Sequence, residues 1–206
     1  MPRETVTTLD LMRHGEPVGG RRYRGQTDDP LSEKGWAQMR NAVGNHCPWQ
    51  VVISSSLSRC ADFSRELAER HQLPLEIDAR LIELGFGAWE GRTPDELTAA
   101  DPETLNRFRS DPLMHAPPSA EPLTAFRDRI ISAWGSLLEH YGGKHVLVVA
   151  HAGVIRMIVA HVLNVPLQHL FRLQVPNAGI TRIRVEKHGA QLFPQLLFHG
   201  VICNPA

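Results

Sequence analysis

The order of hydrophobic and polar positions divides the chain into short apolar runs and longer amphipathic stretches. Runs rich in β-branched residues predict strands, and apolar residues at every third or fourth position predict helices. The expected strands cover residues 7–12, 51–54, 75–78, 145–150, 171–175, 179–185 and 191–198. The expected helices cover residues 32–47, 58–70, 93–110 in two pieces, 122–141 and 153–163.

The alternation of strands with helices predicts an α/β fold of three layers, α/β/α, with a mostly parallel central sheet. The last two strands can form a hairpin around His188 and Gly189, which would add an antiparallel edge to the sheet. Residues 81–121 are expected to form a small helical cap insert over one end of the sheet. A chain of 206 residues can bury one substantial core, so we expect a single domain over residues 1–206.

Charge and cysteine content narrow the class of protein. Lys+Arg and Asp+Glu are 22 each, whereas nucleic-acid binders usually carry a basic excess, so we expect no nucleic-acid partner. The three cysteines, Cys47, Cys60 and Cys203, are too far apart and too few to indicate a disulfide framework, which fits a cytoplasmic location. The start of the chain lacks the apolar core of a secretory signal. The most apolar stretch, residues 145–163, carries charged and histidine side chains and predicts a buried strand and helix instead of a membrane span.

Three expected strands are each followed by side chains suited to binding phosphate. Arg13 and His14 follow the first strand, Arg59 follows the second, and His151 follows the strand at 145–150. Ligands of open α/β sheets bind outside the carboxyl ends of the strands, so these four side chains meet on one rim if the strands are parallel. Arginine offers planar pairs of donors to phosphate oxygens. The residues alone leave two interpretations open, a phosphate site and a set of structural histidines.

Five segments, in order along the chain, resemble motifs of the histidine phosphatase (phosphoglycerate-mutase-like) superfamily. They read LMRHGE at 11–16, RGQTDDPLS at 24–32, SSSLSR at 54–59, ELGFGAWEG at 83–91 and VAHAGV at 149–154. The similarity extends over nearly the whole chain. It implies an enzyme that takes a phosphoryl group from a small-molecule phosphate ester onto a histidine.

The resemblance also implies a role for individual residues. His14 is the expected nucleophile, and Glu83 is the expected acid that protonates the leaving oxygen. Arg13, Arg59 and a protonated His151 are expected to neutralise the phosphoryl oxygens. With this many cations the reaction needs no metal and no cofactor, and the histidines show no metal-ligand spacing. Further substrate-binding positions carried over from the family are Arg24, Gly25 and Ala152.

Several residues near these motifs remain open. Glu90 and Asp95 are alternative acids, because they lie in the same segment as the expected acid. Glu16 either supports the site or lies in solvent. Asn177 either contacts phosphate or stabilises a turn.

The substrate is less well specified than the chemistry. FGAWEG at 86–91 and APPSAEPLTAFR at 116–127 resemble bacterial α-ribazole phosphatases, so α-ribazole 5′-phosphate in cobalamin synthesis is the best guess. The alternatives are a broad-specificity sugar-phosphate phosphatase, a fructose-2,6-bisphosphatase and, less favoured, a phosphoglycerate mutase. A bisphosphate needs additional cations in the cap, and this favours a single phosphate because the insert supplies only Arg92, Arg107 and Arg109.

Two other classes of protein are compatible with some of these features. A non-catalytic phosphate-binding module on the same fold predicts the loss of His14 or Glu83, and both are present. A metal-dependent hydrolase predicts a cluster of ligands, which the sequence does not show.

Overall fold

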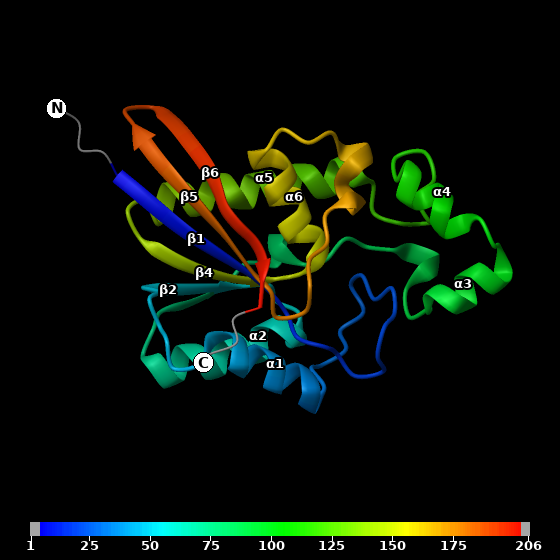
Figure 1. The fold of residues 1–206 in the computed structure, drawn as a ribbon, viewed down its shortest axis with the longest axis horizontal. Coiled ribbons are helices and arrows are strands. Elements are labelled where there is room, and N and C mark those ends of the chain that lie inside the picture. Colours follow the sequence, from blue (N-terminus) through cyan, green and yellow to red (C-terminus); the bar gives the residue numbers. More distant parts are fainter. Residues whose placement is uncertain (1–4, 203–206) are drawn as a thin grey trace.

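A six-stranded sheet forms the centre of the structure, a computed structural model that describes residues 5–202 (Figure 1). The strands are β1 Thr5–Arg13, β2 Val51–Ser54, β3 Leu75–Ile77, β4 His145–Ala150, β5 Ile180–His188 and β6 Gln191–Val201. Their order is β3-β2-β4-β1-β5-β6. β1 to β4 run parallel, while β5 pairs antiparallel with both β1 and β6. The predicted mostly parallel sheet with an antiparallel edge is confirmed.

Helices cover both faces of this sheet, as the three-layer prediction requires. α1 and α2 lie on one face, and α5 and α6 lie on the other (Figure 1). Along β4, Val146 and Val148 belong to the core beneath α5 and α6, whereas Leu147 and Val149 belong to the core beneath α1 and α2. This alternation follows from the strand repeat of two residues. The helices are α1 Glu33–Val43, α2 Ser58–His71, α3 Pro94–Ala100, α4 Thr104–Ser110, α5 Leu123–His140 and α6 Ala152–Val162, and the 3-10 helices are η1 Ala79–Leu81, η2 Gly87–Trp89 and η3 Leu167–Arg172.

The segment 81–121 contains η2, α3 and α4 and lies on the side of the sheet to which β1 and β4 point (Figure 1). Within residues 5–202, no helix is both long and apolar enough to cross a bilayer. Cys47 and Cys60 are free thiols, and Cys203 lies outside the described residues.

The strand expected at residues 171–175 is wrong. The chain forms η3 there and then continues without a strand partner. Arginine side chains from α6 and β1 donate hydrogen bonds to the carbonyls of Leu173 and Val175, at 2.8 and 2.6 Å. Because side chains satisfy these carbonyls, the segment needs no neighbouring strand.

The helix expected at residues 32–47 begins as predicted and ends four residues early. The Ser32 side chain accepts a hydrogen bond from Gly35 N and caps α1. Gly44 leaves the helical conformation at a φ of 53°, and its N–H bonds back to the carbonyl of Arg40. A glycine at the C-terminus of a helix adopts this conformation without the steric cost that other residues have.

A buried carboxylate in β1 connects several parts of the sheet. Asp10 is 1% exposed and accepts hydrogen bonds from Trp49 Nε1 at 2.8 Å, His145 Nε2 at 2.9 Å and Arg182 Nε at 2.7 Å. Burial raises the pKa of Asp10, but the hydrogen bonds from Arg182, His145 and Trp49 outweigh this effect and hold the pKa at about 2. The carboxylate therefore stays charged and joins β1 to β4, β5 and the segment before β2.

We expect Asp10→Asn to lower the free energy of unfolding by about 3 kcal/mol, because it removes one charge of a buried ion pair. Asp62→Asn, which breaks the exposed ion pair with Arg65, is the matched control and should cost less than about 1 kcal/mol. Urea unfolding measures both values. The folded pKa of Asp10 lies below the unfolded value of about 3.9, so its contribution is complete above pH 4 and is lost as the pH falls toward 2. Equal losses in the two variants would contradict this account.

Candidate active site

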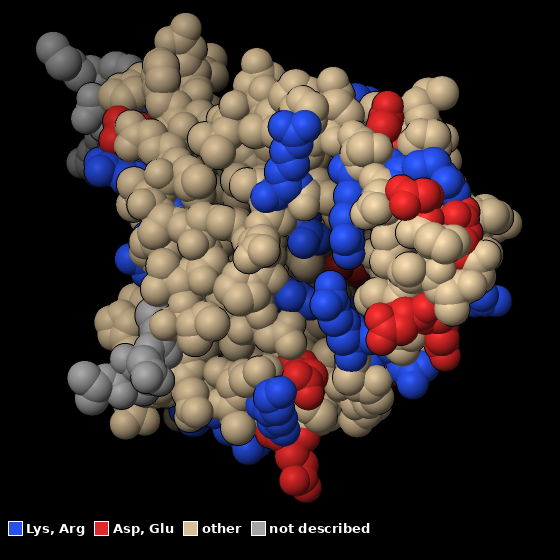
Figure 2. Space-filling model, turned by 45° about the vertical axis from the view of Figure 1, so that its right-hand side comes forward, with Lys and Arg blue, Asp and Glu red and all other residues tan. Residues whose placement is uncertain are grey.

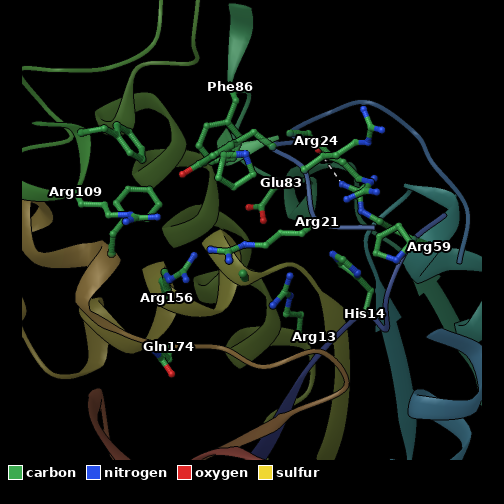
Figure 3. Close-up of a pocket in the computed structure, with 18 residues that line it drawn as sticks. Arg13, His14, Arg21, Arg24, Arg59, Glu83, Phe86, Arg109, Arg156 and Gln174 are labelled. Carbon is green, nitrogen blue, oxygen red and sulfur yellow. Dashed lines mark hydrogen bonds between the residues drawn. The ribbon is translucent and has the colours of Figure 1, made fainter. Parts of the chain in front are cut away.

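A cavity of about 520 Å³ opens at the carboxyl ends of the parallel strands (Figure 3). Figure 2 shows the hollow with Lys and Arg side chains gathered around it. His14 and Glu83 are among the residues that line it. The remaining lining side chains are mostly basic or aromatic and include Arg13, Arg21, Arg22, Arg24, Arg59, Arg109, Arg156, Tyr23, Phe86, Phe108 and Phe171.

His14 directly follows β1, and its ring is held in one orientation. Its Nδ1 lies 2.7 Å from the carbonyl oxygen of Gly15. Since a carbonyl only accepts hydrogen bonds, Nδ1 carries the proton and Nε2 keeps its lone pair. Burial, followed by the charges of Arg13 and Arg59, lowers the pKa of His14 well below its ordinary value. The ring is therefore neutral, with the free lone pair that a nucleophile needs.

Two arginines lie beside this imidazole and are fixed by backbone carbonyls. Arg13 Nη1 donates to Val175 O at 2.6 Å, and burial lowers the pKa of Arg13 to about 10, so it stays charged at neutral pH. Arg59 lies in the first turn of α2 and is 1% exposed. Its guanidinium donates to Gly25 O at 2.8 Å and Thr27 O at 2.7 Å. Arg59 thus lines the cavity and also holds the loop that follows β1.

The His151 side chain is buried and does not line the cavity, and its protonation state differs from the one expected from the sequence. Its ring is fully buried and packs edge-on against His14, with centroids 5.1 Å apart. Nδ1 accepts from Arg59 Nε at 3.3 Å, and Nε2 lies 2.8 Å from Ser55 Oγ. Burial, Arg59 and His14 lower its pKa well below the ordinary value, so the imidazole is neutral. The protonated His151 expected from the sequence is therefore not the state of the ligand-free protein, and the next residue, Ala152, lines the cavity in its place.

Glu83 reaches the cavity from the segment after η1. Its carboxylate accepts hydrogen bonds from Leu84 N at 2.9 Å and Gly153 N at 3.1 Å. A Cβ on Gly153 would come within 2.3 Å of Glu83 Oε1, so the glycine in α6 leaves the space that the carboxylate occupies. The backbone oxygen of Glu83 accepts from Arg129 Nη2 at 3.0 Å, and Arg129 also pairs with Glu121 at 2.7 Å. Arg129 lies outside every motif quoted from the sequence, because its role depends on tertiary contacts alone.

Glu90, the first alternative acid, does not line the cavity. Its carboxylate accepts hydrogen bonds from Gln26 N, Thr27 Oγ1 and Phe86 N at 3.0 to 3.1 Å. Gly25 has a φ of +53°, and a Cβ there would come within 2.2 Å of Glu90 Oε1. Glu90 therefore joins the loop after β1 to the segment that carries the acid, and its oxygens are occupied.

Of the other residues that the sequence indicated, one lines the cavity and three do not. Arg24 lines the cavity, is 8% exposed and pairs with Asp29 at 2.9 Å. Its Nη2 also donates to two carbonyls of its own loop. Arg24 is therefore largely committed to holding this loop. Outside the lining lie Glu16, Asp95 and Asn177.

The charges of the cavity define its chemistry. Arginines supply the positive charge, and across the described part of the chain no group of three or more His, Cys, Asp or Glu side chains is placed to hold a metal ion. A neutral imidazole with a free lone pair, guanidinium groups beside it and one carboxylate nearby can bind a phosphate ester, accept its phosphoryl group and transfer a proton.

Comparison with known proteins agrees with this geometry. The chain matches the histidine phosphatase superfamily (branch 1) over residues 9–193 and belongs to that superfamily. The family expected from the motifs is thereby confirmed.

Named relatives differ in what they are said to act on. The bifunctional protein Rv2228c of Mycobacterium tuberculosis is 33% identical to this chain over 91% of its residues. The chain spans about half of that protein, 53% of its length. An adenosylcobalamin/alpha-ribazole phosphatase of Salmonella typhimurium is 31% identical over 81% of this chain and 85% of its own. The structure of a mycobacterial glucosyl-3-phosphoglycerate phosphatase superposes with a TM-score of 0.82 at 26% identity, covering 95% of this chain and 99% of that one.

We expect His14 and His151 to stay neutral at pH 6, because burial and neighbouring arginines lower both pKa values. In an NMR titration their ring signals should move only well below pH 6.5, while those of the urea-unfolded chain titrate near ~6.5. In this window the unfolded chain binds more protons than the folded chain, so the free energy of unfolding should decrease as the pH falls below 7. A His14 midpoint at or above 6.5 in the ligand-free protein would contradict the prediction.

Proposed function

We propose that this protein hydrolyses a small-molecule phosphate monoester through a phosphohistidine on His14. One observation carries the proposal: the bond between His14 Nδ1 and Gly15 O leaves Nε2 as a free nucleophile next to two arginines. Membership of the histidine phosphatase superfamily supports it. We place the reaction in the cytoplasm, in line with the cysteine usage of the chain.

The proposed reaction has two steps. His14 Nε2 attacks phosphorus, the bond to the leaving oxygen breaks, and Glu83 gives its proton to that oxygen. Arg13 and Arg59 face the negative charge that the three equatorial oxygens carry in the transition state. Water then attacks the phosphohistidine, Glu83 takes the proton of this water, and inorganic phosphate leaves. His151 acts in the ligand-free enzyme by orienting Arg59.

The remaining expected residues fit a binding role in this scheme. Ala152 is the first residue of α6, where backbone N–H groups at a helix N-terminus favour an anion. Gly25 and Arg24 shape the loop that closes one wall of the cavity. We propose that no metal and no cofactor takes part, because arginines supply the cations.

The relatives suggest two candidate substrates. α-Ribazole 5′-phosphate, the best guess from the sequence, is supported by the names of related enzymes and by the aromatic rings of Tyr23, Phe86, Phe108 and Phe171, which can stack on a planar base. A phosphate ester that also carries a carboxylate is supported by the glucosyl-3-phosphoglycerate phosphatase neighbour and by the arginines of the outer cavity.

His14→Ala should abolish turnover of p-nitrophenyl phosphate while the protein stays folded, since it removes the nucleophile. Wild type quenched in alkali during turnover should carry acid-labile phosphate on one histidine, and the variant should carry none. His115→Ala, at an exposed position outside the cavity, should keep both signals. All assays are run in EDTA. Substantial activity of the folded His14→Ala protein would overturn the assignment of the nucleophile.

Glu83→Gln should slow the hydrolysis of alkyl phosphates by about 10²–10⁴-fold, because an alkoxide needs a proton to leave. The variant should still be phosphorylated by p-nitrophenyl phosphate, whose leaving group needs little protonation. Since the same carboxylate activates water, we expect a burst of p-nitrophenol and accumulation of phosphohistidine in stopped-flow experiments.

Two further variants test whether the position of the Glu83 carboxylate matters and whether Glu90 is the acid instead. Gly153→Ala keeps Glu83 but displaces its carboxylate, so it should slow alkyl phosphates in the same direction. Glu90→Gln should give no burst, because this side chain only joins two loops. A burst in Glu90→Gln, or equal slowing of both substrates in Glu83→Gln, would show that the acid is a different residue.

A further inference from the structure

The cavity contains more positive charge than the reaction at the nucleophile requires. All the residues that line the cavity lie within the described part of the chain. Among them, Glu83 supplies the one carboxylate, whereas seven are arginines. A phosphate monoester carries about two negative charges at neutral pH, and Arg13 and Arg59 already lie beside the nucleophile. Arg24 is paired with Asp29. Arg22 uses both Nε and Nη1 to donate to backbone carbonyls, at 3.1 and 2.8 Å, whereas Arg156 uses Nε alone. The arginines with more N–H groups left for a ligand are therefore Arg21, Arg109 and Arg156.

These three arginines come from distant parts of the chain and meet in one place. Arg21 lies in the loop after β1, Arg109 near the end of α4 and Arg156 in the middle of α6. Figure 3 shows Arg21 and Arg156 extending toward each other across the cavity, with Arg109 on the side of Arg156 that is away from His14. Within residues 5–202, none of the three forms an ion pair with a carboxylate.

Arg156 is fixed in this position by its surroundings. Its Nε donates to Leu173 O at 2.8 Å, and its Cζ lies 5.4 Å from the ring centre of Phe171. The guanidinium is therefore oriented before any ligand binds, with its Nη groups left for other partners. The three guanidinium groups outnumber the one carboxylate of the cavity, that of Glu83, so the arrangement favours the binding of an anion.

We infer that Arg21, Arg109 and Arg156 form a second anion subsite, which binds a carboxylate or a second phosphate on the leaving group of the substrate. The inference rests on the proposed function, because the subsite extends the same cavity. Arg156 and Arg13 are near enough for the charge of one to lower the pKa of the other. One small molecule can therefore place its phosphoryl group at His14 and a second anionic group at the subsite.

This subsite changes the substrate class that the sequence favours. Within the cap insert, Arg109 is the only arginine that lines the cavity. Arg21 and Arg156 lie outside the insert and reach the cavity through the fold. A leaving group with its own negative charge therefore fits better than the uncharged nucleoside of α-ribazole 5′-phosphate.

Matched pairs of substrates test the subsite. D-3-phosphoglycerate differs from sn-glycerol 3-phosphate by a carboxylate, and fructose 1,6-bisphosphate differs from fructose 6-phosphate by a second phosphate. For wild type at constant ionic strength, kcat/KM should be at least about tenfold higher for the anionic member of one pair, since charge-assisted hydrogen bonds contribute this much. The pair that shows the preference identifies the second anion as carboxylate or phosphate.

Variants at exposed positions connect the preference to these side chains. Arg109→Gln and Arg21→Gln should each bring the ratio within the preferred pair several-fold closer to one. Arg107→Gln is the matched control, because this residue lies on the same helix α4, pairs with Asp101 and does not line the cavity. It should leave the ratio unchanged. An equal fall of the ratio in Arg107→Gln would overturn the assignment to the subsite.

The outcomes separate this inference from the proposed function. Turnover of p-nitrophenyl phosphate with ratios near one in both pairs would overturn the subsite and leave the phosphatase proposal intact. Absence of turnover with every ester would overturn the proposed function. In that case calorimetric binding to the same protein decides, since D-3-phosphoglycerate should bind at least about tenfold more tightly than sn-glycerol 3-phosphate if its carboxylate occupies the subsite. Equal affinities within both pairs would overturn the subsite.

Discussion

The site depends on the hydrogen bonds of one buried guanidinium group, that of Arg59. A cation that is 1% exposed requires acceptors for its N–H groups, and Arg59 finds them in the carbonyls of Gly25 and Thr27 and in Nδ1 of His151. These bonds fix the loop after β1 over the strand ends and set the tautomer of the second histidine. The same charge helps keep His14 neutral. Loop position, tautomer and nucleophile therefore follow from one buried side chain.

Much of the fold could be predicted because its signals are local. The strand at 145–150 has the predicted bounds, since a continuous run of buried apolar residues that includes three valines leaves little choice. Ser32 marks the start of α1 through its own side chain. The strand predicted at residues 171–175 is wrong for the opposite reason. Arginines from α6 and β1, distant in sequence, donate hydrogen bonds to the carbonyls of this segment. A sequence pattern cannot show which side chain will satisfy a carbonyl when the partner comes from another element.

The same division holds within the site. Motifs and strand ends brought together Arg13, His14, Arg59 and Glu83, which all line one cavity. The protonation of His151 could not be predicted, because it depends on complete burial and on a hydrogen bond from a neighbouring arginine. The sequence indicated Glu90 only as an alternative acid and did not indicate the contacts of Arg129 and Arg156, since each of the three acts through contacts between segments far apart along the chain. Residue type shows which groups are available, and tertiary packing determines which of them face the ligand.

The choice of arginine explains how one cavity can bind anions and still offer a neutral nucleophile. Arginine keeps its proton even when burial lowers its pKa, as Arg13 does at about 10, whereas a histidine under the same conditions loses its proton. Burial and repulsion therefore act on His14 and His151 and leave the arginines charged. A bound phosphate would neutralise part of this repulsion, so the ligand should stabilise the fold as well as occupy the site. Burial, together with the positive charge that binds the substrate, thus keeps the attacking imidazole neutral.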